Sequence, residues 1–271
     1  MNKAIILLSV VVGLTGANAQ KNVNHDSISA EMQALQRVDY PVFKPGERIE
    51  YLVHYGFVHA GKATIEVKEK PVKIKGKDSY HVIGKGVSTG TFDFFFKVRD
   101  TYQSFIDTDN LHPHLFLRDV NEGGYKKVQN YHFHQDENYV KSNKGDSAFI
   151  PTGIQDMISA FYFARTLDLT KYKEGDVIVI YAYVDGELEP VKMRYVGKEK
   201  IKAKAGTFNT LKFQPIVQKG RVFNDPEDLT VYVTDDKNKI PVLAKAKILV
   251  GSVKMQLTDF ENLAHPVAKV D

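Results

Sequence analysis

The sequence predicts an all-β fold, mainly antiparallel, in which a strongly curved, half-barrel or barrel-like sheet packs against one principal α-helix. Stretches rich in β-branched and aromatic residues follow one another at roughly the 8 to 12 residue spacing typical of sandwiches and barrels. They do not alternate with helical segments, as the strands of βαβ folds do. One longer stretch, residues 152–167, repeats its apolar residues at helical spacing and therefore predicts the single main helix.

The predicted helix reads TGIQDMISAFYFARTL. Residues three and four positions apart lie on one face of a helix, and here that face is apolar. The stripe consists of Ile154, Met157, Ile158 and Phe161, and Arg165 continues it. Thr152 followed three residues later by Gln155 has the pattern of a capping box, which predicts that the helix begins there.

The strands on both sides of this helix are predicted from alternation and turn residues. Residues 48–55 alternate between two faces and continue, after Gly56-Phe57, into 58–67, where Ala60-Gly61 indicates a bulge or the close approach of another backbone. Residues 115–120 and 125–134 are expected to pair across the turn between them. Asp185-Gly186 is a two-residue hairpin turn that requires positive φ.

The first nineteen residues have the composition of a removable signal peptide. Lys3 gives a positive start, residues 4–14 are apolar, and Ala17-Asn18-Ala19 is a small-residue cleavage signal. We therefore expect cleavage at about Ala19/Gln20 and a periplasmic or secreted protein. Elsewhere the chain has no run approaching the roughly 18 apolar residues of a membrane helix, so no transmembrane segment is expected in the mature chain.

The composition of the chain argues against nucleic acid as a partner and against cysteine-based cross-links or metal sites. The formal net charge of +4, which includes Lys3 of the leader, is too small for the dense basic face of a nucleic-acid-binding protein. The chain has no cysteine, which excludes disulfides and thiolate metal sites. A domain of this length can bury a sufficient core without such cross-links.

We expect one β-rich domain rather than two. The predicted organisation is a signal peptide at 1–19, a flexible arm at 20–42 with one short helix, a domain at 43–263 and a tail at 264–271. The domain has two halves, 43–151 and 168–263, joined by the helix at 152–167.

Three stretches of the chain carry a family resemblance. They read PGERIEYLVHYGFVHAGKATIEV, QDMISAFYFAR, and AGTFNTLKFQP followed by LTVYVTDDKNKIPVLAKAKILVGSVKMQL. In this order they resemble an exported bacterial family, domain-of-unknown-function family 3108, over roughly residues 43–260. The resemblance implies an exported, β-rich protein and carries no catalytic residues to this sequence.

Motifs for familiar chemistry are missing. The sequence has no G-x-S-x-G and no H-E-x-x-H, so we predict that the protein is not an enzyme and expect no cofactor. Two His-x-His pairs stand out, His112-Pro113-His114 and His132-Phe133-His134. The metal candidate is the pair His132 and His134, since residues i and i+2 of a strand point to the same side. The alternative is that both histidines face solvent while Tyr131 and Phe133 point inward, and no third ligand is indicated.

The densest aromatic cluster is Phe92-Asp93-Phe94-Phe95-Phe96. If this segment is a strand, Phe92, Phe94 and Phe96 share one face and Phe95 points the other way. The segment is then either a central core strand or the border of an apolar pocket. The predicted ligand-binding residues are Phe92, Phe94, Phe95, Phe96, Phe161 and Tyr162.

The function predicted from these features is non-catalytic work in the cell envelope. The first hypothesis is that the protein binds or carries an apolar or amphipathic, lipid-like ligand. The alternatives are a scaffold or assembly factor that binds other envelope proteins, and a metal-dependent enzyme that uses the histidine pairs.

Overall fold

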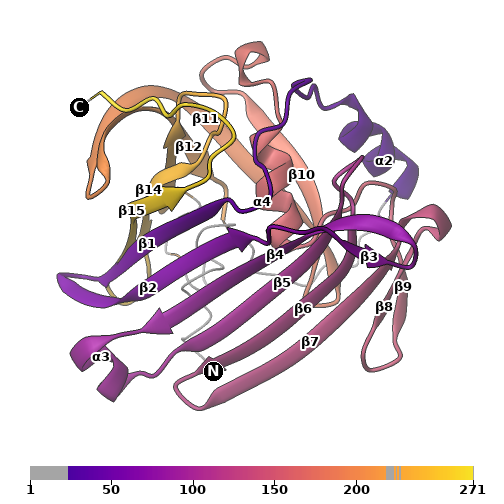
Figure 1. Ribbon diagram of the computed structural model, residues 1–271, viewed down its shortest axis with the longest axis horizontal. Coiled ribbons are helices and arrows are strands. Elements are labelled where there is room, and N and C mark those ends of the chain that lie inside the picture. The colour runs from indigo at the N-terminus through magenta and orange to yellow at the C-terminus, as the bar shows by residue number, and fades with distance from the viewer. Residues whose placement is uncertain (1–23, 218–222, 224, 226, 271) are drawn as a thin grey trace.

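The structure is a 15-stranded antiparallel sheet that curves around one helix (Figure 1). It is a computed structural model, which describes residues 24–217, 223, 225 and 227–270. The all-β, strongly curved architecture predicted from the sequence is confirmed. The predicted leader at 1–19 and the first residues of the predicted arm lie outside the described residues.

From residue 24 to 149, the described chain contains two helices and nine strands. They are α2 (His25–Ala34), β1 (Arg48–Tyr55), β2 (Val58–Val67), β3 (Val72–Ile74), β4 (Lys77–Ser88), α3 (Gly90–Phe95), β5 (Arg99–Asp107), β6 (Pro113–Glu122), β7 (Tyr125–His134), β8 (Tyr139–Ser142) and β9 (Ser147–Phe149). The second part contains α4 (Met157–Arg165), β10 (Val177–Val184), β11 (Glu187–Ala203), β12 (Gly206–Pro215), β13 (Leu229–Thr234), β14 (Pro241–Lys247) and β15 (Ser252–Glu261). Short 3-10 turns lie at Gln135–Glu137 and Leu169–Lys171.

Nearly every strand pairs with its neighbour in the sequence. The order across the sheet is β10-β11-β12-β13-β14-β15-β1-β2-β4-β5-β6-β7-β8-β9, with β3 paired to β4. Because β15 pairs with β1, the first and last strands are adjacent. Within the described residues β9 and β10 are the two ends of this order and are not paired with each other, and the segment containing α4 connects them. The sheet is therefore an open curve rather than a closed barrel.

The predicted hairpins are present. The turn between β10 and β11 has φ of +56° at Asp185 and +93° at Gly186, as the sequence required. Between β1 and β2 the pairing shifts at Ala60, which is the predicted bulge. A Cβ on Gly61 would lie 2.3 Å from the carbonyl oxygen of Val87, so only glycine permits this approach of β2 to β4.

Helix α4 begins later than the predicted residue 152. Gln155 still lies against the sheet, where its N–H donates to the Tyr181 carbonyl at 3.1 Å and its carbonyl accepts from Tyr183 N–H at 2.8 Å. These bonds to β10 hold the backbone extended until Asp156. The prediction of a helix over the whole of 152–167 was wrong at its start because this pairing is a tertiary interaction.

The capping box is formed by Asp156 and Ser159 rather than by Thr152 and Gln155. One carboxylate oxygen of Asp156 accepts from the backbone N–H groups of Ile158 and Ser159, at 2.7 and 2.8 Å. The Ser159 hydroxyl accepts in return from the Asp156 N–H at 2.8 Å. The other carboxylate oxygen accepts from the Ser104 hydroxyl on β5 at 2.5 Å, so the same residue caps the helix and attaches it to the sheet.

Helix α4 lies inside the curve of the sheet and packs against β10 and β5 (Figure 1). Met157, Ile158, Tyr162 and Phe163 are all buried, although they point in different directions around the helix. A helix that is apolar on most sides is typical of a fully enclosed one. Burial of such side chains contributes roughly 1.5–3 kcal/mol each, so α4 is a large part of the core.

The part of the predicted arm that the structure describes contains α2, which contacts β10. Ile28 and Met32 of α2 are buried in the same hydrophobic cluster as α4. Val38 N–H donates to the Thr166 carbonyl at 2.8 Å, so this segment is bonded to the end of α4. The described arm is thus docked on the domain.

We predict that the cap of α4 depends on Asp156 and not on Thr152. The substitution D156A removes two cap hydrogen bonds and leaves the buried Ser104 hydroxyl without its acceptor, which should lower the free energy of unfolding by about 2–3 kcal/mol. T152A removes only a hydrogen bond from Thr152 to Asn138 and should cost about 1 kcal/mol or less. Urea unfolding followed by far-UV circular dichroism measures both. Equal costs for the two variants would contradict the assignment of the cap.

Candidate functional site

An apolar cavity of about 90 Å³ lies between α4 and strands β10 to β14. It is partly open to solvent. The helical segment contributes Ala160, Phe161, Ala164 and Leu167, and the sheet contributes residues such as Ile178, Val191, Phe213 and Val231. Arg165 and Lys239 are the charged residues of its wall. The site therefore combines an apolar interior with two cationic side chains.

A second apolar cavity, of about 40 Å³, lies on the other side of Phe161. It is bordered by β1, β2, β4 and β15 together with Met157 and Ile158 of α4. Phe161 and Pro241 line both cavities. The half-buried ring of Phe161 therefore stands between two apolar spaces on the inner face of the sheet.

The arrangement of Phe161 follows from its place beside Tyr162. Consecutive helical residues are about 100° apart around the axis, so the two rings point in different directions. Tyr162 is fully buried and packs edge-on against Phe43, with ring centroids 4.5 Å apart. Phe161 is left to face the cavities.

Lys239 is the unusual residue of the wall. Its side chain is buried, with 7% of the residue exposed, and its ammonium has no hydrogen-bond partner within the described part of the chain. Its ammonium lies 5.6 Å from the centroid of the Tyr40 ring, and the charges of Asp236 and Asp168 also favour its protonated form. Burial, and then the positive charge of Arg165, lower the pKa of Lys239. A buried cation without a partner is costly in free energy, and an anion or hydrogen-bond acceptor beside it would reduce that cost.

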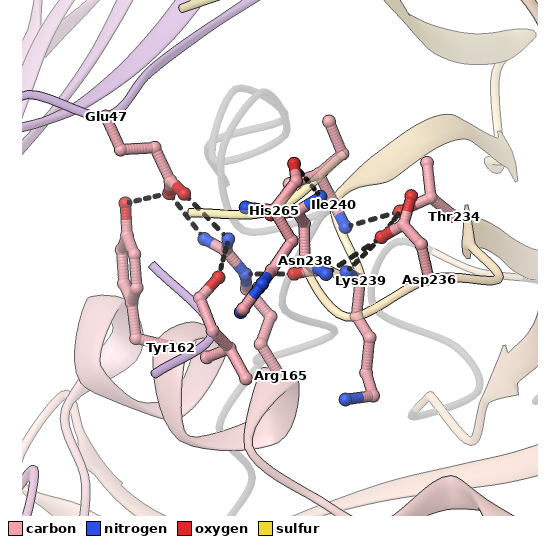
Figure 2. A network of polar contacts seen from close by, with 10 residues as sticks. Glu47, Tyr162, Arg165, Thr234, Asp236, Asn238, Lys239, Ile240 and His265 are labelled. Carbon is pink, nitrogen blue, oxygen red and sulfur yellow. Dashed lines mark hydrogen bonds and ion pairs between the residues drawn. The ribbon is translucent and has the colours of Figure 1, made fainter. Parts of the chain in front are cut away.

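The turn that carries Lys239 is rigidly held. Lys239 itself has a positive φ of +51°, which is uncommon for a lysine. One carboxylate oxygen of Asp236 accepts from the N–H groups of Asn238 and Lys239, at 2.8 and 3.1 Å, and from the Thr234 hydroxyl at 2.9 Å. Figure 2 shows the Lys239 side chain extending away from this cluster, with no dashed line to its ammonium.

Arg165, the other cation of the wall, is fully paired. It forms a two-bond ion pair with Glu47, at 2.5 and 2.8 Å, and both residues are buried (Figure 2). It also donates to the carbonyls of Val42 and Asn238, each at 2.8 Å. Burial acts to lower the pKa of Arg165, but the charge and hydrogen bonds of Glu47 outweigh it and raise the pKa. Arg165 is therefore neutralised internally, and Lys239 is not.

One residue of the second cavity's wall, Tyr51, also carries a polar atom without a partner in the described part of the chain. The hydroxyl of Tyr51, which lines that cavity, is buried and has no hydrogen-bond partner within the described residues. Burial raises the pKa of Tyr51, so the phenol is neutral and can donate or accept a hydrogen bond. Each cavity is thus lined by one residue whose buried polar group has no hydrogen-bond partner among the described residues.

Of the predicted aromatic site residues, the structure places Phe161 at the cavities and Tyr162 in the core beside them. Phe92, Phe94, Phe95 and Phe96 do not join them. The strand on which that prediction depended is not formed: residues 90–95 form helix α3, which begins at Gly90 with φ of +61°, and Phe96 follows as its C-cap. Phe94 and Phe95 are 88% and 82% exposed and line neither cavity.

The metal candidates His132 and His134 lie on β7, with Tyr131 and Phe133 buried on the opposite face. The ammonium of Lys75 lies 3.0 Å from Nε2 of His134. Burial and the charge of Lys75 lower the pKa of both histidines. Across the residues that the structure describes, no group of three or more histidine or acidic side chains is placed to hold a metal ion.

A buried acid pair lies elsewhere on the sheet. Asp100 begins β5 and Glu122 ends β6, and both are buried. Burial and then the neighbouring Asp100 raise the pKa of Glu122 to about 9, which keeps it protonated at neutral pH. Neither acid lines the two cavities described above. We assign this pair to the packing of the sheet.

Sequence reasoning did not identify Glu47, Tyr51 or Lys239. Glu47 follows Pro45-Gly46 and Lys239 ends the polar run Asp235 to Lys239, so both read as ordinary turn residues. The one available signal was Arg165, a charged residue on the apolar stripe of a helix, because a buried guanidinium requires a carboxylate partner.

Fold and cavity together define a barrel-like, antiparallel β protein that encloses a helix and an apolar space. By sequence, the chain belongs to the family described as protein of unknown function (DUF3108), whose model matches residues 50–258. The family resemblance found in the sequence is confirmed. No curated protein matches the chain.

Solved structures resemble it in fold. A beta-barrel-like protein of domain of unknown function DUF1849 from Brucella abortus superposes with a TM-score of 0.54 at 9% identity, covering 81% of this chain and 99% of that one. A hypothetical protein from Chlamydia trachomatis gives 0.37 at 8% identity, covering 84% and 93%. A DUF1089 family protein from Pseudomonas aeruginosa gives 0.36 at 11%, covering 66% and 87%. The first likeness supports the barrel-like fold alone. Among the described residues no helix is long and apolar enough to cross a membrane.

We predict that the Glu47–Arg165 pair is required for stability. E47Q should lower the free energy of unfolding by about 3–5 kcal/mol, because it leaves the buried Arg165 charge uncompensated. The double variant E47L/R165M should cost less than the sum of the single changes, since it removes both charges together. Urea unfolding followed by far-UV circular dichroism gives these values.

An exposed ion pair provides the matched control. Lys73 and Asp78 lie 2.9 Å apart with both side chains more than half exposed. D78N should therefore change stability by less than about 1 kcal/mol. A cost for E47Q as small as that for D78N would refute the role given to the buried pair.

Proposed function

We propose that this protein is a non-catalytic component of the bacterial envelope that binds one apolar chain of an amphipathic, lipid-like ligand against α4. The observation that carries the proposal is the apolar cavity with the unpartnered ammonium of Lys239 in its wall. Export is supported by the leader-like sequence at 1–19. No catalytic family is indicated by the comparisons.

The size of the cavities limits the ligand. The larger cavity, of about 90 Å³, is smaller than an engineered cavity of about 150 Å³ which binds benzene, and the second cavity holds about 40 Å³. This space suits part of a single slender chain, with the rest of the ligand extending through the open side. An entering apolar chain gains dispersion contacts with the apolar lining of the cavity.

The charges of the wall favour an anionic head group. Glu47 already neutralises Arg165, whereas Lys239 has no counter-ion within hydrogen-bond distance among the described residues. A carboxylate or phosphate placed beside Lys239 would accept charge-assisted hydrogen bonds from its ammonium, which are stronger than those between neutral groups. The ligand class we propose is therefore a single-chain amphiphile with an anionic head.

We predict that A164L fills the larger cavity and abolishes ligand binding. Ala164 lines this cavity at a half-buried position, so the longer side chain occupies the space with little strain on the core. Native mass spectrometry of protein purified from bacterial envelopes, followed by lipid extraction, should show a bound amphiphile on the wild type and little on A164L.

The control for this experiment is A148L. Ala148 is also half-buried but lies on β9, away from both cavities. A148L should retain the ligand. If no lipid is recovered from the wild type, and crosslinking recovers envelope proteins instead, the scaffold hypothesis replaces this one.

We further predict that Lys239 selects the head group. Wild-type protein should bind dodecanoate more tightly than 1-dodecanol, and K239M should weaken dodecanoate binding by about 10-fold or more while leaving 1-dodecanol unchanged. Isothermal titration calorimetry measures both ligands. K237M is the matched control, because exposed Lys237 lies in the same turn, 4.8 Å from the Tyr40 ring centroid. Equal weakening by K237M and K239M would show that Lys239 has no specific role.

A further inference from the structure

Exposed apolar side chains gather at one end of the molecule, away from the cavities. Phe57 is fully exposed, at 104%, and Phe94 and Phe95 are 88% and 82% exposed. With Val58, Leu249 and Val250, which are about half exposed, these residues define what we call the aromatic tip. The tip is formed by the β1–β2 turn, helix α3 and the β14–β15 turn.

Hydrogen bonds and packing hold these three segments together. Gly56 N–H donates to the Ser252 carbonyl at 2.8 Å, and the Tyr55 hydroxyl donates to the Val250 carbonyl at 2.5 Å. On the other side, Thr89 N–H donates to the Ala60 carbonyl at 3.1 Å, and α3 packs on β2. Figure 1 shows α3 and the β1–β2 turn at the same end of the sheet.

Helix α3 is anchored so that only two of its phenylalanines point outward. Phe92 lies near Tyr55, with ring centroids 6.1 Å apart, and the ring of Phe96 occupies the space where Gly123 lacks a side chain. Asp93 forms an ion pair with Arg99 at 2.7 Å. These contacts hold α3 in place, and α3 in turn holds Phe94 and Phe95 in exposed positions.

Basic residues outnumber acidic ones in the three segments that form the tip, and Asp228 lies beside them, where its carbonyl accepts from Lys247 N–H at 2.8 Å. Within residues 54–62, 90–99 and 247–254, the basic residues are Lys62, Lys97, Arg99, Lys247 and Lys254, and the single acidic residue is Asp93. Asp93 is already paired with Arg99. Protruding aromatic rings surrounded by lysines match the chemistry of an anionic bilayer, where apolar side chains enter the boundary of the acyl chains and ammonium groups meet the phosphates.

We propose that the aromatic tip docks the protein onto the surface of a membrane that contains anionic lipid. Phe57, Phe94 and Phe95 enter the interface, and the neighbouring lysines contact head groups. The charge pattern carries this choice of partner, because with Asp93 paired to Arg99 these segments retain four lysines, and an apolar patch for another protein would not need such an excess of basic side chains. The proposal does not depend on the cavity or on its ligand.

The chain contains no tryptophan, so a single introduced one reports on its own position. With vesicles of phosphatidylcholine and phosphatidylglycerol, F57W and F94W should each show a blue shift in emission and quenching by brominated lipid. F149W is the control, because Phe149 is also exposed, at 59%, but lies on β9. An F149W response equal to that of F94W, or no response from F57W and F94W, would overturn the proposal.

Vesicle co-sedimentation tests the same idea without tryptophan. Wild-type protein should bind vesicles that contain phosphatidylglycerol, lose most of that binding between 0.05 and 0.5 M salt, and bind pure phosphatidylcholine at least about 10-fold more weakly. F57S/F94S/F95S should bind at least about 10-fold more weakly than wild type, and F149S should bind as wild type does. A wild-type dimer in analytical ultracentrifugation that the triple variant abolishes, without vesicle binding, would assign the tip to a second copy of the chain and overturn the membrane proposal.

Discussion

The buried ion pair between Arg165 and Glu47 is the constraint on which the rest of the structure depends. The sheet is open between β9 and β10, so strand pairing alone does not fix where the helix lies inside the curve. Arg165 supplies what pairing does not: it ties α4 to Glu47 before β1, to the Val42 carbonyl, and to Asn238 between β13 and β14. Removing two charges from water is costly, and only good geometry and additional hydrogen bonds offset that cost. The pair therefore favours one position of the helix over other apolar packings, and that position creates the cavities on both sides of Phe161.

The sheet was largely predictable because its signals are local. Alternation with a period of two and turn residues such as Asp185-Gly186 are set by neighbours in the chain, and strands β1, β2 and β7 have the predicted limits. The existence of α4 was predictable from its helical spacing for the same reason. Its start was not, because the hydrogen bonds that keep Gln155 extended come from β10, more than twenty residues away in the sequence. The prediction for Phe92 to Phe96 failed for a different reason. Alternation of side chains between two faces assumes a strand, but the chain turns at Gly90 and forms a short helix there.

The site was less predictable than the fold because it depends on the three-dimensional surroundings of Lys239, where its ammonium has no hydrogen-bond partner among the described residues. Phe161 and Tyr162 could be proposed from the pattern of the helix. Nothing in the run DDKNK distinguishes Lys239 from its exposed neighbour Lys237, since both are lysines of a polar turn. The difference arises in three dimensions, where the positive φ of Lys239 and the bonds from Asp236 direct one ammonium toward an apolar space that contains no partner for it. The need for an anion is a property of that enclosure and not of the residue type.

Strand β1 connects the smaller cavity to the aromatic tip and therefore sets the distance between them. Tyr51 borders the smaller cavity and Tyr55 ends the same strand at the aromatic tip, so about four residues of extended chain, or roughly 13 Å, separate them. One leaflet of a bilayer's hydrocarbon core is roughly 15 Å thick. With the tip seated at the head groups, the smaller cavity lies about one acyl-chain length from the bilayer surface. A chain that left the bilayer beside the tip could reach the inner face of the sheet while its head group stayed near solvent. Because β1 pairs with β2 on one side and β15 on the other, the sheet holds the distance between the tip and this cavity, and access to the cavity would depend on how the protein is oriented at the membrane.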